Sequence, residues 1–504
     1  MKATFKYIVT AFAVCAALVS CQKDNLTGNV DNNPAVGNTR VIEAHFGTAT
    51  KSTLGGNNGR TPIFSNGDKI MVSNGTSKEE CTVNVENGKA TFTTSLTGDL
   101  TAIYPSAAAK LNGNAIDGVI VPATQDGTFA KANIAKATIA SNATSATFDN
   151  QTTLLRFYVD KSIGVKSITI TAGGNANIAD GSKTIVVDPE GDVTLDTVTD
   201  DPGRRICYVS VLPGTFTSLK FTSVTTTQKD YTNNTVERTA SNVTLATNKI
   251  YNAFIPYYID LGTEGKWGYC NIGAFLPEDA GMYFAWGETT GHKPSTEGEG
   301  AFTFGKDNGG FAADFSNCSH SIGLNPDDNG PIFIKYMLPG LEKPHWGGTG
   351  NPDNLTVLEA VDDAATANWG EGWRMPKIEE FEALIDLCTN NFESGYSFGT
   401  SPNIIFLPAA GDGANTDLED KGSWGIYWSS SLNIDNNEGV DCGPGNGNTL
   451  EFWFDPDPNW SEYIFTPDIS LEARYLGCSI RPLKIVTADV RPDYTETGPE
   501  ETVF

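Results

Sequence analysis

The sequence is poor in the residues that most catalytic and metal sites require. It has four histidines in 504 residues, and they are too scattered for the spacing of a zinc site. It contains no Gly-x-Ser-x-Gly nucleophile elbow and no Walker loop. Asp and Glu are abundant, but the sequence gives no geometry that would select a glycosidase pair. We therefore expect a binding protein rather than an enzyme.

Long apolar segments are also missing, apart from one at the N-terminus. Two lysines precede the apolar run 7–19, which is typical of a secretory signal peptide over residues 1–20 and is short for a membrane span. The residues Leu18-Val19-Ser20-Cys21 resemble a bacterial lipobox, which implies that a lipid is attached to Cys21. Such a lipid would anchor the protein firmly to a membrane.

The residues after Cys21 favour display on the cell surface. Gln22-Lys23-Asp24-Asn25 resembles the surface-export signal of Bacteroidota lipoproteins, although Asn25 stands where that signal usually has an acid. Residues 21–39 are rich in Asn and Gly and predict a flexible tether. We expect an outer membrane lipoprotein on the cell surface.

Basic residues and tryptophan are unevenly distributed along the chain. From Asp260 onward there are 12 Lys and Arg against 40 Asp and Glu, whereas the preceding part has 22 and 21. All nine tryptophans lie at or after Trp267. Regions that differ in both respects predict separate domains, with a boundary near 256–260. The acidic second half argues against nucleic acid and anionic membrane surfaces as its ligands.

Residues 40–257 show almost no helical periodicity. They contain short alternating runs rich in Thr and Val, separated by Gly and Asn, such as 41–46, 69–73, 81–85, 154–159, 167–171, 184–187 and 206–212. Many short strands with turn signals between them predict β-sandwiches. We expect two, over residues 40–153 and 154–257.

Motifs in these two regions resemble those of the Mfa-like fimbrillin family. The resemblance implies two transthyretin-like β-sandwiches and a subunit or accessory component of a Bacteroidota pilus. The motifs are Thr50-Lys51-Ser52-Thr53-Leu54, Gly67-Asp68-Lys69-Ile70, Ala102-Ile103-Tyr104-Pro105, Leu155-Arg156-Phe157, Val165-Lys166-Ser167-Ile168 and Tyr208-Val209-Ser210-Val211-Leu212-Pro213-Gly214.

The same resemblance implies partners and a processing step. Fimbrillins assemble with other pilus subunits by β-strand addition, in which a strand of one subunit fills a groove in another. A trypsin-like protease first removes the first strand after an arginine. Arg40 is our candidate for that arginine and Arg60 is the alternative. An arginine that ends a linker and has no such role explains Arg40 equally well.

The region 258–484 carries a second ordered set of motifs, which resembles the Fibrobacter succinogenes major paralogous domain. The resemblance implies an α+β fold similar to C-type lectins and to the formylglycine-generating enzyme, without implying an activity. The motifs are Lys266-Trp267-Gly268, Phe284-Ala285-Trp286-Gly287-Glu288, Gly372-Trp373-Arg374-Met375-Pro376, Trp428-Ser429-Ser430-Ser431 and Arg474-Tyr475-x-Gly477-Cys478-Ser479-Ile480-Arg481-Pro482.

One segment of this region has the periodicity of a helix. Apolar residues recur every three or four positions, which predicts an amphipathic helix from Pro376 to about residue 390. Glu379, Glu380 and Glu382 would face water. A single helix among strands predicts a module in which the helix packs on a small antiparallel sheet.

Two tryptophans and two aspartates are the candidate ligand-binding residues. Trp346 and Trp460 lie in Gly- and Pro-rich loops, where exposed indole faces could stack on sugars, whereas the tryptophans within the motifs are expected in the core. Asp455 and Asp457 offer oxygen ligands close to Trp460. The acidic loops could hold Ca²⁺ or form a solvated surface, and none has the spacing of a known calcium loop.

Cysteines give no firm pairing. Seven remain outside the signal peptide and Cys21, so at least one takes part in no internal disulfide. Five lie in the second half, where up to two bridges could form. Buried reduced thiols are the simpler expectation for cysteines this widely separated.

These features predict a mainly β surface lipoprotein in which two fimbrillin-like sandwiches carry a C-type-lectin-like head. A whole domain stands where a polymerising subunit would have its donor strand, which favours a pilus-tip or accessory adhesin for a host or dietary glycan or protein. The tail, 485–504, is acidic and contains Pro492, so we expect disorder there. A free-standing surface glycan-binding lipoprotein is the alternative, and a carbohydrate-active enzyme is the third reading.

Overall fold

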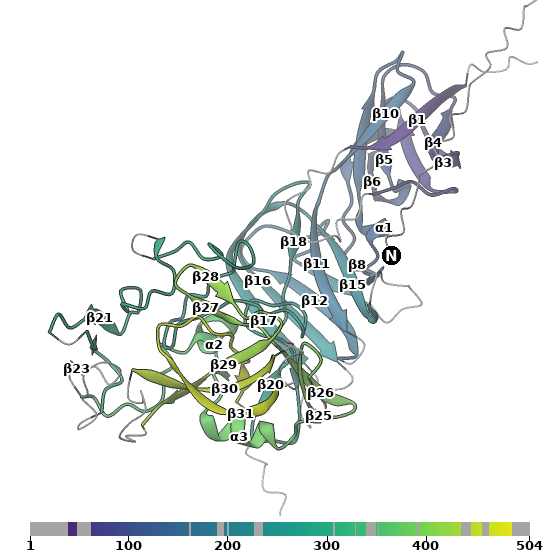
Figure 1. The fold of residues 1–504 in the computed structure, drawn as a ribbon. Coiled ribbons are helices and arrows are strands. Elements are labelled where there is room, and N and C mark those ends of the chain that lie inside the picture. The colour runs from purple at the N-terminus through teal and green to yellow at the C-terminus, as the bar shows by residue number, and fades with distance from the viewer. Residues whose placement is uncertain are drawn as a thin grey trace, which may run out of the picture.

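The chain is mainly β, with sheets arranged in three groups. In the computed structural model the described residues are 39–47, 62–160, 163–188, 196–198, 201–225, 235–305, 308–327, 329–338, 349–350, 352–389, 392–434, 445–455 and 463–485. Strands account for 49% and helices for 6%, which confirms the predicted fold class. Figure 1 shows a barrel at one end, a two-sheet sandwich in the middle and a head of small sheets and helices at the other end.

Seven strands near the start form a closed barrel in the order β1-β10-β9-β5-β2-β3-β4. β3 passes from one side to the other, because residues 78–82 pair with β2 and residues 83–86 pair with β4. β10 likewise joins β1 to β9. The barrel is therefore a sandwich whose two sheets share β3 and β10. Its strands are β1 (Arg40–Phe46), β2 (Lys69–Ser73), β3 (Lys78–Glu86), β4 (Lys89–Thr94), β5 (Leu100–Tyr104), β9 (Ala135–Ile139) and β10 (Ser145–Asn150).

β1 closes the barrel. It runs parallel to β10 on one side and antiparallel to β4 on the other. Its alternate residues Ile42 and Ala44 point inward, as the two-residue period of a strand requires, and join a separate core that includes Val72 and Phe148. Without β1 the circuit of hydrogen bonds would be open between β4 and β10.

Short elements link the barrel to the next unit. They are η1 (Ser106–Ala108), β6 (Ala109–Asn112), β7 (Ala115–Val119), β8 (Thr124–Gln125) and α1 (Phe129–Ala132). β8 pairs with β13 of the second sandwich. The Gln125 amide also exchanges hydrogen bonds with the backbone of Ser210, at 2.8 and 2.9 Å. A segment within the first predicted domain therefore completes a sheet of the second.

The second unit is a sandwich of two sheets. One has the order β14-β15-β11-β18 and the other β17-β16-β12-β13-β8. The additional strands are β11 (Thr153–Asp160), β12 (Val165–Ala172), β13 (Thr184–Val187), β14 (Asp196–Val198), β15 (Asp201–Val211), β16 (Gly214–Thr225), β17 (Thr235–Leu245) and β18 (Ile250–Asn252).

The head begins and ends in the same sheet, β19-β20-β32-β24. Trp267 of β20 pairs with Leu483 of β32, so strands from the two ends of the head lie side by side. Smaller sheets and two helices surround this base. The elements are β19 (Tyr258–Ile259), β20 (Lys266–Gly268), β21 (Ser321–Leu324), β22 (Pro331–Phe333), β23 (Thr349–Gly350), α2 (Ala364–Trp369), β24 (Trp373–Arg374), α3 (Ile378–Ile385), β25 (Gly395–Thr400), β26 (Asn403–Pro408), β27 (Asp412–Ala414), β28 (Asp417–Glu419), β29 (Trp424–Leu432), β30 (Asn446–Asp455), β31 (Tyr463–Ala473) and β32 (Leu483–Lys484).

The predicted helix is present as α3 but is shorter than expected. Lys377 is its N-cap, and the chain leaves the helix through tight turns in which Leu387 N–H bonds to Leu384 O and Cys388 N–H to Ile385 O. Phe381 and Leu384 are fully buried, as predicted. Glu380 does not simply face water, because it accepts hydrogen bonds from Lys377 N–H and from the Arg374 guanidinium.

The prediction of a single helix was wrong. α2 is one and a half turns of Ala, Thr, Asn and Trp, with no amphipathic period to signal it. It is fixed by the buried Asp363, which accepts hydrogen bonds from Thr366 N–H at 2.9 Å and Met375 N–H at 2.8 Å. Local capping and tertiary contact therefore replace periodicity as the cause of this helix.

A single apolar core runs through the second sandwich and the head. At the seam the Phe254 ring lies 5.1 Å from Trp369, and Tyr158 lies 5.7 Å from Phe275. The core therefore crosses the predicted boundary at 257/258. Trp286, Trp373 and Trp428 are buried within it, as expected of the motif tryptophans. Cys207, Cys270 and Cys478 are buried free thiols of the same core, whereas the buried free thiols Cys81 and Cys318 belong to two other clusters.

Candidate functional site

Most of the predicted site residues lie outside the described residues. These are Cys21, Arg60, Trp346, Trp460 and Asp457, so their roles stay predictions. Asp455 is the last residue of β30, and its backbone pairs with Tyr463. Only the backbone of Asp455 belongs to the described part of the structure.

Arg40 is described, and it holds one end of the barrel. Its guanidinium donates hydrogen bonds to Gly98 O at 2.9 Å, Ala140 O at 2.8 Å and Ala143 O at 3.2 Å. The three carbonyls belong to loops that flank β5 and the β9–β10 hairpin. This arrangement gives Arg40 a structural role at the first residue of β1.

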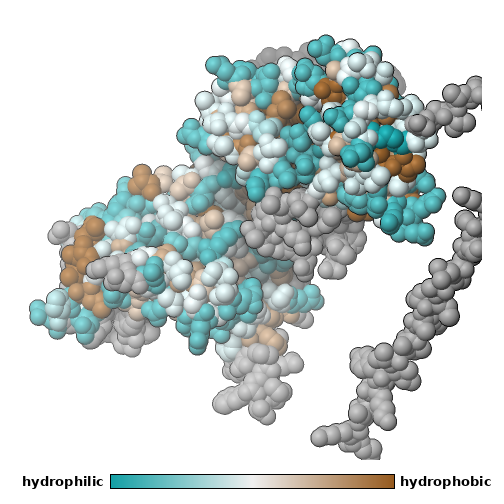
Figure 2. Space-filling model, turned by 90° about the horizontal axis from the view of Figure 1, so that it is seen from above, coloured by the Kyte–Doolittle hydropathy of each residue, from teal (hydrophilic) through white to brown (hydrophobic). Residues whose placement is uncertain are grey.

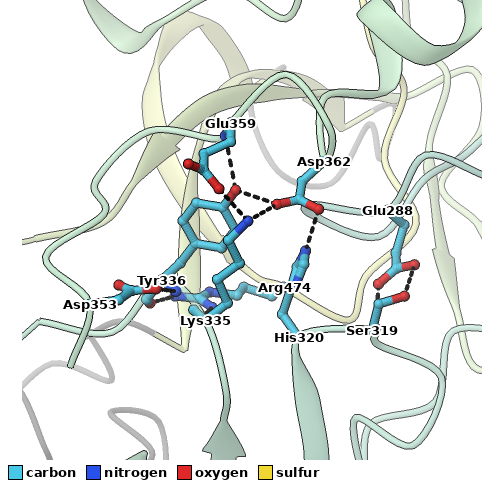
Figure 3. A network of polar contacts seen from close by, with 9 residues as sticks. All are labelled: Glu288, Ser319, His320, Lys335, Tyr336, Asp353, Glu359, Asp362 and Arg474. Atoms are coloured by element: carbon cyan, nitrogen blue, oxygen red, sulfur yellow. Dashed lines mark hydrogen bonds and ion pairs between the residues drawn. The ribbon is translucent and has the colours of Figure 1, made fainter. Parts of the chain in front are cut away.

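A network of charged side chains braces the head loop that follows β22 (Figure 3). Asp362 accepts hydrogen bonds from Tyr336 Oη and Lys335 Nζ, each at 2.5 Å. Tyr336 Oη in turn accepts from Glu359 N–H at 2.9 Å. His320 Nε2 lies 3.4 Å from Asp362 Oδ1, outside hydrogen-bond geometry. The network thus ties Lys335 and Tyr336 to residues just before α2.

The electrostatics of this network follow from burial and pairing. Burial acts to raise the pKa of Asp362, but the hydrogen bonds from Lys335 and Tyr336 outweigh it and lower that pKa. Burial and the Asp362 carboxylate raise the pKa of Tyr336 to about 12. The charged groups therefore satisfy one another, which is typical of a structural network rather than an acid–base pair.

Arg474 contacts the same loop through a hydrogen bond and two aromatic rings. Its guanidinium is fully buried, 4.7 Å from the Trp286 ring and 4.2 Å from the Phe333 ring, and it donates to Tyr336 O at 2.6 Å. Burial lowers the pKa of Arg474 to about 9. Tyr336 has a positive φ of 60°, and Asp353 holds that turn by accepting from the N–H groups of Tyr336 and Met337.

A pocket of about 260 Å³ lies beside this network. Glu288 connects the two, because its carboxylate accepts from Ser319 N–H at 2.5 Å and Ser319 Oγ at 2.7 Å, next to His320. The pocket combines hydrogen-bonding groups with aromatic rings, which suits a small polar ligand with an apolar face. Its main lining side chains are Glu288, Thr290, His292, Phe304, Asn317 and Tyr475.

The sequence singled out only part of this pocket. Glu288 and Tyr475 lie within motifs quoted in the sequence analysis, whereas Thr290, Phe304 and Asn317 come from loops without a motif. Phe304 and Phe311 pack edge to face at 4.9 Å, and the Gly-rich segment between them gave no signal of that contact. The proximity of these loops is a long-range feature of the fold.

Three carboxylates form a second cluster in the head. Burial raises the pKa of Asp412, Glu451 and Glu472 to about 7 in each case. Neighbouring acids raise the pKa of each of the three further. In the part of the chain that is described, no group of three or more His, Cys, Asp or Glu is placed to hold a metal ion.

Comparisons with known proteins give little further identification. No protein-family model and no curated protein matches the chain. A crystal structure of a Bacteroides fragilis protein, provisionally described as a cell adhesion protein, is similar over 42% of this chain and 89% of that one. The identity is 10% and the TM-score 0.25, which does not establish a shared fold. Among the described residues, no helix is long and apolar enough to span a bilayer.

Proposed function

We propose that this chain is a cell-surface adhesin of the fimbrillin-like kind, placed at a pilus tip or as an accessory subunit, whose head binds a glycan or protein ligand. The arrangement of the units carries the proposal: β1 lies in the barrel at one end and the β21–β23 side of the head lies at the other (Figure 1). Before any processing at Arg60, a lipid on Cys21 would hold the barrel near the membrane and direct the head outward.

The 260 Å³ pocket is the proposed glycan site. A sugar ring presents C–H faces that stack on aromatic rings and hydroxyls that bond to carboxylates and amides. Tyr475 and Phe304 offer the rings, and Glu288, His292 and Asn317 offer the polar groups. Loops on a rigid scaffold are the usual place for such a site.

A protein ligand is the second candidate, favoured by an apolar surface at the far end of the head. Ile322 of β21 is 67% exposed and Ile334, just after β22, is 54% exposed. Figure 2 shows a brown patch at the left margin, where Figure 1 places β21. Exposed apolar patches often mark protein contacts.

Binding is best tested on the lipid-free full chain, Cys21→Ala, against a glycan array with calcium and again with chelator. The isolated head is a poorer choice because its separation would expose the apolar seam at Trp369. Thr290→Trp, at an exposed residue of the pocket wall, should abolish binding. Trp346→Ala and Trp460→Ala test the loop sites predicted from sequence. Binding that survives Thr290→Trp would exclude the pocket, and no binding at all would favour a protein ligand.

β1 is the proposed exchangeable strand through which other pilus subunits add. Its loss would open the barrel between β4 and β10 and vacate the inward positions of Ile42 and Ala44. Cleavage after Arg60 would separate all of β1 from the rest of the chain, whereas cleavage after Arg40 would leave it attached. We therefore favour Arg60 over Arg40 as the processed arginine.

Treatment with an arginine-specific protease, followed by measurement of the intact mass, shows which of the two arginines is cleaved. Arg60→Ala should prevent release of the segment that contains β1, whereas Arg40→Ala should permit it. Recovery of the trimmed chain in sheared fibres supports the pilus reading. An intact chain that stays with the membrane would favour the free-standing lipoprotein instead.

A further inference from the structure

The largest of the described cavities is not the pocket in the head but a groove of about 490 Å³ between the second sandwich and the head. One wall is the inner face of β16 and β17, with Leu219, Phe221 and Val243. The opposite wall comes from the head and the chain leading into it. Its principal side chains are Phe254, Phe275, Met282, Asn368 and Trp369.

The charge of this groove is opposite to that of the protein. The chain has a net charge of −27, yet the groove is lined by Arg238 and Lys293 and by no acidic residue among those described. Arg238 occupies an inward position of β17, between Val236 and Ala240 on the same face. A cation at such a position is unusual because it is withdrawn from water.

Neither cation has a carboxylate partner among the described residues. The Arg238 guanidinium lies 5.2 Å from the centre of the Phe254 ring, and Lys293 Nζ lies 5.8 Å from that of Phe275. Burial lowers the pKa of Arg238, and no neighbouring acid opposes it. A half-buried cation without a counter-charge is destabilising, and an anion that entered the groove would relieve this.

We propose that this groove binds a small amphiphilic anion, an aliphatic or aromatic body that carries a carboxylate or a sulfonate. The body packs on Leu219, Phe221 and Val243, and the anionic group lies between Arg238 and Lys293. The volume is within the range of about 300–1,000 Å³ that small-molecule sites occupy. The site is separate from the proposed glycan pocket, and the adhesin function does not depend on it.

The test is calorimetric titration of the lipid-free full chain with decanoate below its micelle concentration, beside decyltrimethylammonium as the matched cation. Decanoate should bind and decyltrimethylammonium should not. Arg238→Gln should weaken decanoate binding about tenfold or more, because a charged hydrogen-bond donor is lost. Lys166→Gln removes the same charge from an exposed position of β12 away from the groove, and should leave the affinity unchanged.

Two further variants keep the result decisive if Arg238→Gln does not fold. Lys293 is exposed, so Lys293→Gln should fold normally and still weaken binding severalfold. Ala240→Phe on β17 should fill the groove and block decanoate. Equal binding of both probes, no effect of either cation substitution, or no binding of decanoate would each overturn the proposal. Binding of an acidic apolar peptide without decanoate would assign the groove to a protein partner instead.

Discussion

The barrel and the remainder of the chain differ in how their cores are built. The barrel has its own cluster of buried residues inside a closed circuit of strands. The second sandwich and the head share one cluster that crosses the point where tryptophan and acidic residues become abundant. A change in composition along this chain therefore does not coincide with a boundary in its packing.

We expect the largest loss of stability from a substitution in the core that the second sandwich shares with the head. Ile170→Ala, at a fully buried residue of β12, should cost about 2–5 kcal/mol. All nine tryptophans lie in the head, so their fluorescence reports its unfolding. If the core is shared, this substitution in the sandwich should lower the melting temperature read from tryptophan by several degrees. Ile70→Ala, equally buried in the barrel, is the control and should leave that transition unchanged.

Arg474→Met tests how much a buried cation contributes to the stability of the head. It removes the donor to Tyr336 O and the cation between Trp286 and Phe333, at a cost of about 2–3 kcal/mol. Lys421→Met, which changes the same charge on the surface of the head, is the matched control. Thermal unfolding followed by tryptophan fluorescence checks this. An unchanged melting temperature would show that apolar packing alone holds the loop.

The head and the barrel should also differ in their response to pH. Asp412, Glu451 and Glu472 have pKa values raised to about 7 from ordinary values of 3.8 or 4.5. Between about pH 4.5 and 7 the folded head therefore binds more protons than the unfolded chain, and its stability should fall as the pH rises through that window. Melting temperatures at pH 5 and pH 8 measure this, and Glu451→Gln should reduce the difference.

Carboxylates with lowered pKa values act in a different range. Asp353 and Asp362 contribute stability that is lost only as the pH falls through their lowered values, below pH 4. They do not mask the expected trend between pH 5 and pH 8. A tryptophan transition that does not depend on pH in that interval would contradict the role given to the three raised carboxyls.

The smallest effect is expected at Arg40. Arg40→Ala removes three hydrogen bonds to loop carbonyls at the partly exposed end of the barrel, so we expect a loss of about 1 kcal/mol in the barrel alone. Differential scanning calorimetry would detect it as a small shift in the barrel transition. A shift in the tryptophan signal as well would show that the barrel and the shared unit unfold together.

The parts of the fold that the sequence predicted were those with a local periodicity of apolar residues. Alternating runs located β2, β11 and β12, and the apolar period located α3. The motif tryptophans are in the core because nothing else buries so much apolar surface. By contrast α2 depends on Asp363, which caps it and also binds Met375, and this contact between separate segments has no local sequence signal.

The sites were less predictable because they are assembled from distant segments. Glu288 and Tyr475 were visible only as motif residues, and the pocket residues Thr290, Phe304 and Asn317 come from loops without a motif. Arg238 lies in a strand where alternation suggests nothing more than another polar position, and its inward side becomes apparent only from the packing of β17 against the head. Long-range contact thus creates both candidate binding sites.

The pairing of β20 with β32 has a mechanical consequence for an adhesin. The head is entered and left at neighbouring, hydrogen-bonded strands, with Lys266 opposite Lys484. If the proposed ligand pulls on the outer loops, the force therefore enters and leaves the head on the same side. It passes across the contact between Phe254 and Trp369 before it reaches the second sandwich and the barrel.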